Sequence, residues 1–313
     1  MIYLDSFHFP SVEDEEAFLG DYYSGDFYNE KYEHAGVNGD YPFRVLSKHR
    51  LVSLDFEPIT ILYGGNGSGK STILNIIAEK LRVKRNTLYN RTIMTERYVD
   101  MCDYKINEEC MELLPFHRLS DISKMMTSDD VFKAIIDKRN RNKRKLAKSI
   151  QLKEDIKSVK DWRPPKINFE TGEGLEQYDN YRKYKNRKTE QIIIDEIGAL
   201  QQEYSNGETG MTILAKGIEE EGLYLLDEPE NSLSCAFQEQ LAQLILLSAK
   251  LFNSQFIIAT HAPFLLAIPG AKIYNLDTDP VTLSQWWELE NMQKYFLLFN
   301  SYSEQFKKKI SRI

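Results

Sequence analysis

Short apolar stretches alternate with amphipathic stretches near both ends of the chain. Residues 59–63 and 256–259 are apolar or β-branched throughout, a pattern that predicts strands buried on both faces. The apolar residues Ile73, Ile76 and Ile77 recur at helical spacing. The predicted order is strand 59–63, helix 71–82, strand 222–226, helix 234–251 and strand 255–260. Alternating strands and helices predict an α/β fold with a mainly parallel sheet flanked by helices.

Residues 83–200 have a different pattern, which predicts a mainly helical, basic insertion. Thr127 and Asp130 stand at capping-box spacing and predict a helix start. The helix continues into a polar stretch and is expected to end at Pro164 and Pro165, and a short antiparallel hairpin is the suggested form. The expected organisation is therefore a split core, residues 1–82 and 201–313, around an insertion of residues 83–200.

A glycine-rich segment at residues 64–71 follows the first predicted core strand and precedes its helix. Its sequence, Gly-Gly-Asn-Gly-Ser-Gly-Lys-Ser, matches the P-loop pattern G-x-x-x-x-G-K-[ST] in the required context. Glycines let backbone N–H groups wrap phosphate oxygens, and the helix N-terminus adds its positive dipole end. Lysine reaches the β and γ phosphates, and the serine hydroxyl holds magnesium. The expected nucleotide-binding residues are Gly64, Gly65, Asn66, Gly67, Ser68, Gly69, Lys70, Ser71 and Thr72.

Two further strands end in groups suited to hydrolysis. Asp227 and Glu228 close the strand at residues 222–226, as in a Walker B motif. Asp227, with Ser71, is the expected magnesium ligand, and Glu228 is the expected general base. The strand at residues 255–260 leads into His261, which alone would more often be structural.

The segment before the Walker B strand completes a resemblance to the ABC ATPase superfamily. Ser205, Asn206, Gly207 and Glu208 resemble its signature motif in the form used by the SMC and RecF-like branch, with Tyr204 in place of leucine. By this resemblance His261 contacts the γ-phosphate, so Glu228, His261 and Lys70 are the expected catalytic residues. The resemblance also implies ATP as the nucleotide and an antiparallel edge portion beside the parallel sheet.

The stretches Asp-Glu-Pro-Glu-Asn-Ser-Leu-Ser and Ala-Thr-His-Ala-Pro resemble bacterial overcoming-lysogenization-defect (OLD) proteins and the group described as AAA family ATPases. The resemblance covers residues 41–82 and 203–290. In that superfamily the signature contacts the γ-phosphate bound by another subunit. One P-loop and one signature per chain therefore imply a homodimer with two shared ATP sites.

The net charge of −7 is unevenly distributed along the chain, and two charged blocks are candidate partner surfaces. Residues 1–40 carry ten acidic residues and one lysine, whereas residues 133–188 carry 18 Lys and Arg against 8 Asp and Glu. Such blocks often mark partner surfaces, and solvated faces are the other interpretation. Tyr178, Tyr181 and Tyr184 in the basic block would either stack on bases or pack one helical face.

The three cysteines lack metal-site spacing and predict free thiols in a reducing cytoplasm. No signal peptide or membrane-spanning apolar run is expected. The favoured function is an ATPase switch for a protein effector, and the resemblance suggests a role in bacterial anti-phage defence. A DNA-acting ATPase that binds through residues 133–188 is the alternative. A transporter subunit is disfavoured, and the pair Asp277 and Asp279 is interpreted as part of a turn, not a nuclease centre.

Overall fold

The computed structural model describes residues 1–24, 40–86, 89, 91–113, 119–161, 175–185, 187–199, 205–218 and 221–310. Contacts divide the chain into two compact units, which are described separately. The first unit combines residues 1–131 and 206–313, and the second comprises residues 132–205.

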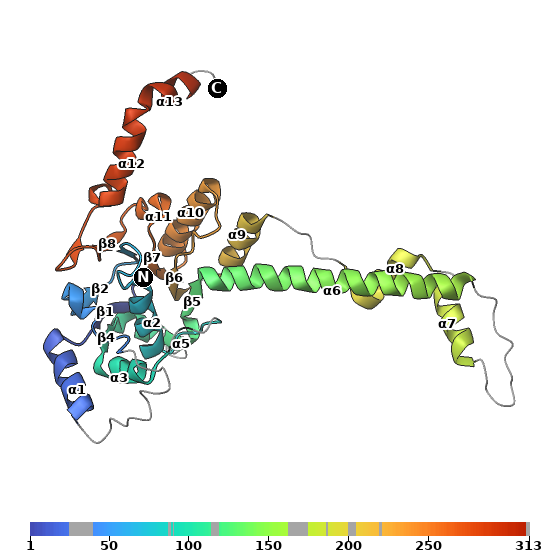
Figure 1. Ribbon diagram of the computed structural model, residues 1–313, viewed down its shortest axis with the longest axis horizontal. Helices are drawn as coiled ribbons and strands as arrows, with labels where there is room; N and C mark the ends of the chain where they lie inside the picture. The colour runs from blue at the N-terminus through green and yellow to red at the C-terminus, as the bar shows by residue number, and fades with distance from the viewer. Residues whose placement is uncertain are drawn as a thin grey trace. The chain divides into compact units, whose positions relative to one another are not determined.

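The first unit is built on a six-stranded sheet with the order β5-β6-β7-β3-β8-β9. Figure 1 labels β5, β6, β7 and β8 of this sheet. The first five strands run parallel, and β9 pairs antiparallel with β8 at one edge. Every residue of β3 and β7 is buried, as their apolar sequences predict. The expected α/β class with a mainly parallel sheet and an antiparallel edge is confirmed. The strand bounds are β3 Ile59–Tyr63, β5 Lys124–Thr127, β6 Gly222–Asp227, β7 Ser254–Ala259, β8 Lys272–Asn275 and β9 Thr282–Leu283.

A second sheet with the antiparallel order β2-β1-β4 belongs to the same unit. Its strands are β1 Leu4–His8, β2 Ser53–Asp55 and β4 Asp103–Ile106. The buried side chain of Gln255 in β7 joins the two sheets, since its Oε1 accepts from the N–H groups of Tyr3 and Leu4 and its Nε2 donates to the Leu4 carbonyl, all at 2.9 Å. A buried amide with these partners is satisfied, so the link costs little desolvation.

Helices α2 (Lys70–Lys80) and α10 (Cys235–Leu251) pack against the parallel sheet, close to the predicted bounds. Glu15, one of the acids in the N-terminal block, is not solvated: it is 1% exposed and accepts from the Arg44 N–H, the Ser47 hydroxyl and the Tyr98 hydroxyl. The other helices of this unit are α1 Val12–Ser24, η2 Ser47–His49, α3 Ile93–Met101, α4 Glu108–Leu113, α5 Leu119–Ile122, α9 Asn206–Gly217, α11 Pro263–Leu266, η3 Trp286–Glu288, α12 Glu290–Ser301 and α13 Ser303–Ile310.

The long helix α6 (Ser128–Asp161) begins at the predicted cap. The N–H of Thr127 donates to Asp130 Oδ2 at 2.9 Å, and the N–H of Asp130 donates back to Thr127 Oγ1 at 3.2 Å. The second unit consists of most of this helix with α7 (Leu175–Lys185) and α8 (Thr189–Ile197). Lys160 donates to the Arg187 carbonyl and Lys145 to the Ala199 carbonyl, so α8 runs antiparallel to α6.

The division of the chain differs from the expected boundary at residue 83. Residues 83–131 belong to the first unit, because β4 pairs with β1 and β5 pairs with β6. Tyr181 is 9% exposed and packs under the ammonium group of Lys185, whereas Tyr178 is exposed. Packing therefore accounts for Tyr181. In the part of the chain that the structure describes, no helix is both long and apolar enough to cross a bilayer.

Candidate active site

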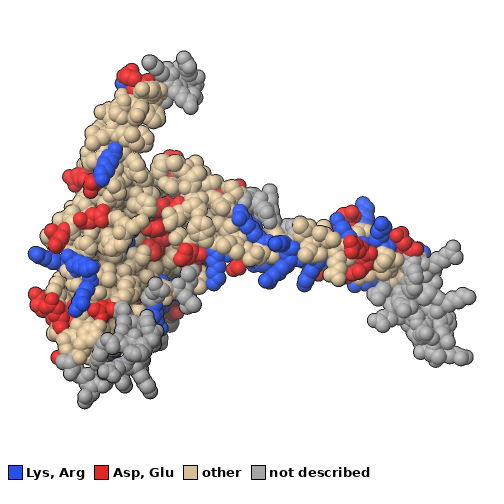
Figure 2. All heavy atoms as spheres, in the orientation of Figure 1, with Lys and Arg blue, Asp and Glu red and all other residues tan. Residues whose placement is uncertain are grey.

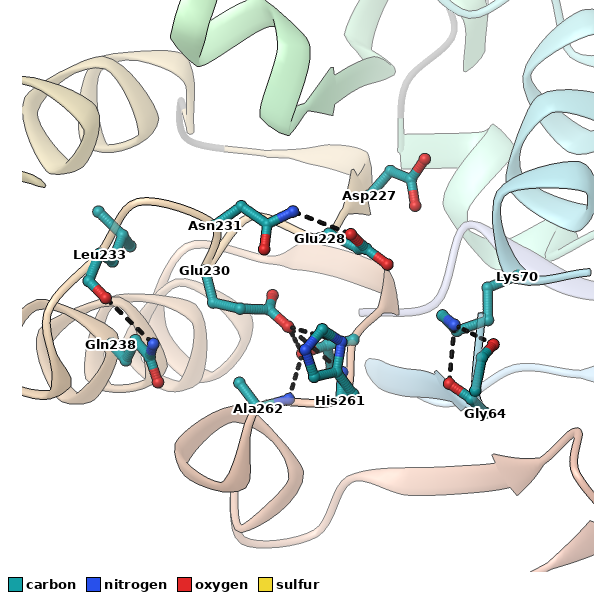
Figure 3. A network of polar contacts seen from close by, with 12 residues as sticks. Gly64, Lys70, Asp227, Glu228, Glu230, Asn231, Leu233, Gln238, His261 and Ala262 are labelled. Carbon is teal, nitrogen blue, oxygen red and sulfur yellow. Dashed lines mark hydrogen bonds and ion pairs between the residues drawn. The ribbon is translucent and has the colours of Figure 1, made fainter. Parts of the chain in front are cut away.

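The predicted catalytic groups lie at one edge of the parallel sheet. In the strand register, Leu62 of β3 pairs with Ala259 of β7, and Ala259 pairs with Asp227 of β6. The P-loop, His261 and Asp227 therefore follow the carboxyl ends of three adjacent strands, where ligands bind in open α/β sheets (Figure 3). Sequence spacing alone does not bring these groups together, because the strand order departs from chain order.

The P-loop holds its lysine against its own backbone. The Lys70 ammonium donates to the carbonyl oxygens of Gly64 and Gly65 at 2.7 and 2.9 Å, and the residue is only 5% exposed. Gly64 admits no side chain, because a Cβ there would lie 2.4 Å from Ser68 Oγ. That hydroxyl is buried and has no hydrogen-bond partner among the residues that the structure describes. An unpaired buried hydroxyl in a glycine-rich loop fits an anion-binding cradle.

Glycine geometry and one distant carboxylate shape the rest of the loop. Gly67 and Gly69 have φ values of 83° and 93°, the left-handed region that glycine adopts without steric cost. Asp277, from the turn after β8, accepts the Gly65 N–H through both carboxylate oxygens at 2.8 and 3.1 Å. This contact joins residues 212 positions apart and fixes the outer end of the loop. The turn at Asp277 therefore supports the P-loop.

Ser71 and Asp227 form the predicted metal pair. The Ser71 hydroxyl donates to Asp227 Oδ1 at 3.0 Å. Burial raises the pKa of Asp227 to about 6, against the lowering effect of the Ser71 hydrogen bond. Mg²⁺ prefers hard oxygen ligands, which this pair provides. A bound cation would also favour the charged carboxylate that burial disfavours. Among the described residues no three His, Cys, Asp or Glu side chains form a metal cluster, so phosphate and water would complete the coordination.

Glu228 is held in position by its backbone and by one amide. Its φ is 45°, a left-handed conformation that costs free energy in a residue with a side chain, and such strain is concentrated at functional sites. Its N–H donates to the Ala259 carbonyl at 2.9 Å, and Asn231 Nδ2 donates to Glu228 Oε2 at 2.8 Å (Figure 3). A carboxylate oriented by an amide in this way can accept a proton from water.

The backbone at His261 is held by Glu230, a residue to which the sequence motifs assigned no role. Glu230 Oε1 accepts from Thr260 Oγ1 at 2.5 Å and from the His261 N–H at 3.2 Å, and it lies 3.8 Å from His261 Nδ1. The Glu230 side chain is 4% exposed, and its buried Oε2 has no partner in the described part of the chain (Figure 3). The His261 ring is half-exposed, so Glu230 fixes the backbone beneath a ring that remains open to ligands.

The signature residues Asn206, Gly207 and Glu208 form the first turn of α9, and Ser205 directly precedes it. The positive dipole end of a helix N-terminus favours an anion. A Cβ at Gly207 would lie 3.2 Å from both the Ser232 carbonyl oxygen and the Phe237 ring. The first turn of α9 is therefore packed against the loop that follows the Walker B strand.

The comparison with protein-family models decides the family. The model described as "ABC transporter" matches residues 51–231, more than half of the 313 residues. The chain belongs to the ABC transporter family. It is a P-loop ATPase of the ABC type, an enzyme that binds a nucleotide with a divalent metal and hydrolyses ATP.

A second family model and several solved structures are also similar to this ABC ATPase, over a shorter segment or at low sequence identity. A model described as "AAA domain, putative AbiEii toxin, Type IV TA system" matches residues 209–267. The Smc head domain of Pyrococcus furiosus, bound to the C-terminal domain of ScpA, is 16% identical over 78% of this chain and 95% of that one, with a TM-score of 0.39. A dimeric bacterial ABC transporter cassette is 14% identical over 76% and 90%, with a TM-score of 0.34. No curated protein matched the chain.

The structure brings together the P-loop, Asp227, Glu228 and His261 on one sheet edge and adds two supporting carboxylates, Asp277 and Glu230. Glu230 belongs to the Asp-Glu-Pro-Glu stretch, so its position was a usable signal. No sequence pattern pointed to Asp277 as a support of the P-loop, since only the fold brings it to the Gly65 N–H. Phe43, which precedes the P-loop strand, packs between Phe18 and Tyr98 in the core, whereas the Tyr41 hydroxyl lies 3.3 Å from Thr72 Oγ1.

Proposed function

We propose that two copies of this ABC ATPase enclose two ATP molecules and act as a nucleotide-controlled switch for a partner protein. The observation that carries the proposal is the packing of Gly207 against Ser232. It places the signature turn beside the loop whose Asn231 binds Glu228. A signature turn that contacts the γ-phosphate of a second protomer would thereby press on the catalytic loop of its own protomer, coupling the two sites.

Each residue has a role that follows from its present contacts. Lys70 exchanges its bonds to the Gly64 and Gly65 carbonyls for phosphate oxygens, which offer a stronger charge-assisted hydrogen bond. Ser71 and Asp227 would hold Mg²⁺, which neutralises phosphate charge when bound. Glu228 accepts a proton from water, and His261 donates a hydrogen bond toward the γ-phosphate.

Hydrolysis would end the association because each γ-phosphate is bound by both protomers. Loss of the transferred phosphate removes contacts from both sides at once, a change that order-switching proteins commonly use. Glu228→Gln keeps a neutral oxygen for Asn231 but cannot accept the proton, so it is expected to accumulate an ATP-bound dimer. Gel filtration with light scattering in ATP and Mg²⁺ measures this, and a variant that hydrolyses ATP at the wild-type rate would contradict the assignment.

The shared site is tested with two variants that fail for different reasons. Lys70→Ala should lose phosphate binding, whereas Ser205→Arg should bind nucleotide with unchanged Kd but fail to hydrolyse it. When the two are co-expressed and the mixed pair is purified through two tags, one complete site remains. Roughly half of the wild-type activity per dimer is then expected, because a two-fold dimer has two equivalent sites. A mixed pair as inactive as its parents would rule out the shared site.

A DNA-acting ATPase is the second candidate, supported by the exposed basic residues of α6. Figure 2 shows Lys and Arg gathered along this helix, and those exposed on it include Lys133, Arg139, Arg141, Lys143 and Arg144. Such residues bind phosphates and release counterions, so affinity would fall steeply with salt. A titration of duplex DNA at several salt concentrations tests this. Absence of binding at low salt would leave the protein-partner switch as the function.

A further inference from the structure

The C-terminal helices α12 and α13 carry an apolar surface that the ATPase site does not use. Several of their aromatic and leucine side chains are about half-exposed, and the adjoining Trp287 is similar. Exposed fractions are Trp287 52%, Tyr295 45%, Phe296 64%, Leu298 53%, Phe299 55%, Tyr302 53% and Phe306 51%. Contiguous exposed apolar area of this size marks an interaction site.

Four of these residues form a continuous seam. Tyr295, Phe299, Tyr302 and Phe306 follow one another at steps of four, three and four residues, the a/d spacing of a two-stranded coiled coil. Three of the four rings follow one another in contact: the centroids of Tyr295 and Phe299 are 6.4 Å apart, and those of Phe299 and Phe306 are 5.9 Å apart. The second contact crosses from α12 to α13, so the seam continues through the junction at Tyr302.

The charges nearby do not oppose pairing with an identical surface. Residues 295–303 contain no charged residue. Lys294 is bound to Glu290 at 2.5 Å and Lys307 to Glu304 at 3.4 Å, each within its own helix. Figure 2 shows charged side chains near the start of α12 and an uncharged surface along the rest of the helix. An isologous contact requires a surface that is compatible with itself, and residues 295–303 carry no charge that would repel their copies.

The exposed area is sufficient for a stable dimer. Six aromatic side chains of 150–250 Å², each about half-exposed, offer roughly 600 Å² per copy, to which Leu298 adds. Standard interfaces bury about 800 Å² per partner. Leu289 is fully buried and Met292 is 5% exposed, so the start of α12 is fixed to the first unit and the seam begins one helical turn later. A fixed seam pairs with less loss of conformational entropy than a free one.

We infer that α12 and α13 pair with the same helices of a second copy, through the seam of Tyr295, Phe299, Tyr302 and Phe306. This contact needs no nucleotide and would keep two protomers together when their ATP sites are open. A membrane surface is the competing occupant, because α13 carries Lys307, Lys308 and Lys309 directly after the last seam residue, and vesicle sedimentation is therefore part of the test.

The test compares two glutamates on one helix. Phe299→Glu places a charge in the seam, whereas Leu297→Glu places the same charge at a side chain that is 63% exposed and lies outside the seam. Each protein is measured at full length, in chelator without nucleotide, by light scattering over a dilution series. Wild type and Leu297→Glu are expected to be dimeric, and Phe299→Glu monomeric with unchanged helical circular dichroism.

Three results would overturn the inference: a wild-type monomer without nucleotide, equal masses for the two variants, or a monomer that sediments with vesicles of anionic phospholipid. The outcome is independent of the ATP switch. Lys70→Ala, which is expected to lose phosphate binding, should still be dimeric through the seam, whereas Phe299→Glu should still associate when ATP is added. Failure of one contact is therefore distinguishable from failure of the other.

Discussion

Replacement of Asp227 by asparagine is expected to stabilise the nucleotide-free protein at neutral pH while removing metal binding. Burial raises the pKa of Asp227 from 3.8 to about 6. Two pK units correspond to about 3 kcal/mol, the free energy by which folding disfavours the charged carboxylate. Asparagine has no charge to bury, and its amide oxygen can still accept the Ser71 hydroxyl.

The sign of the pH dependence follows from proton binding. The folded state holds the Asp227 proton more tightly than the unfolded state does. The contribution of this group to the free energy of unfolding is therefore fully present below about pH 4 and is lost as the pH rises through about pH 6. The stability advantage of Asp227→Asn should therefore grow by roughly 1.5 kcal/mol between about pH 5 and about pH 8. Urea unfolding in chelator, followed by circular dichroism at both pH values, measures the difference.

Asp279→Asn is the matched control. The Asp279 side chain is 53% exposed and faces Arg50 at 3.7 Å, so its replacement should change stability little at either pH. In Mg²⁺ and ATP the wild-type protein should be more stable than Asp227→Asn, because only the carboxylate binds the metal strongly. An Asn variant that is less stable than wild type near neutral pH in chelator, or an advantage independent of pH, would refute the reasoning.

Substitutions at three further residues test the supporting contacts. Glu230→Ala leaves the Thr260 hydroxyl and the His261 N–H without their acceptor, so a loss of about 1–3 kcal/mol in urea unfolding is expected. Hydrolysis should fall while nucleotide Kd is retained, and Glu230→Gln, which keeps one acceptor, should recover part of the rate. Asp277→Ala frees the Gly65 N–H and should weaken nucleotide binding in a fluorescence titration; an unchanged Kd would deny it a role in the loop. Gly64→Ala brings a Cβ to 2.4 Å from Ser68 Oγ and should abolish nucleotide binding without unfolding the protein; wild-type affinity would contradict the geometry.

The sequence predicted the core elements well because their signals are local. The bounds of β3, β6, β7, α2 and α10 follow from apolar runs, helical spacing and the glycine-rich turn, each contained within about 20 residues. The strand β5 escaped prediction, since its Lys-Met-Met-Thr sequence is short and gains strand character only by pairing with β6. Because β5 pairs with β6, residues 83–131 belong to the first unit, and its boundary lies at residue 131 and not at the expected residue 83.

The sequence by itself determined the P-loop, the Walker B carboxylates and the family, because the phosphate-binding backbone is encoded within one continuous turn. Only the tertiary structure decided that Asp277 supports the P-loop, that Glu230 fixes His261, and that burial raises the pKa of Asp227. It also decided that the aromatic seam of α12 and α13 is exposed. These properties depend on which distant groups meet and on how much water is excluded, and neither is set by local spacing.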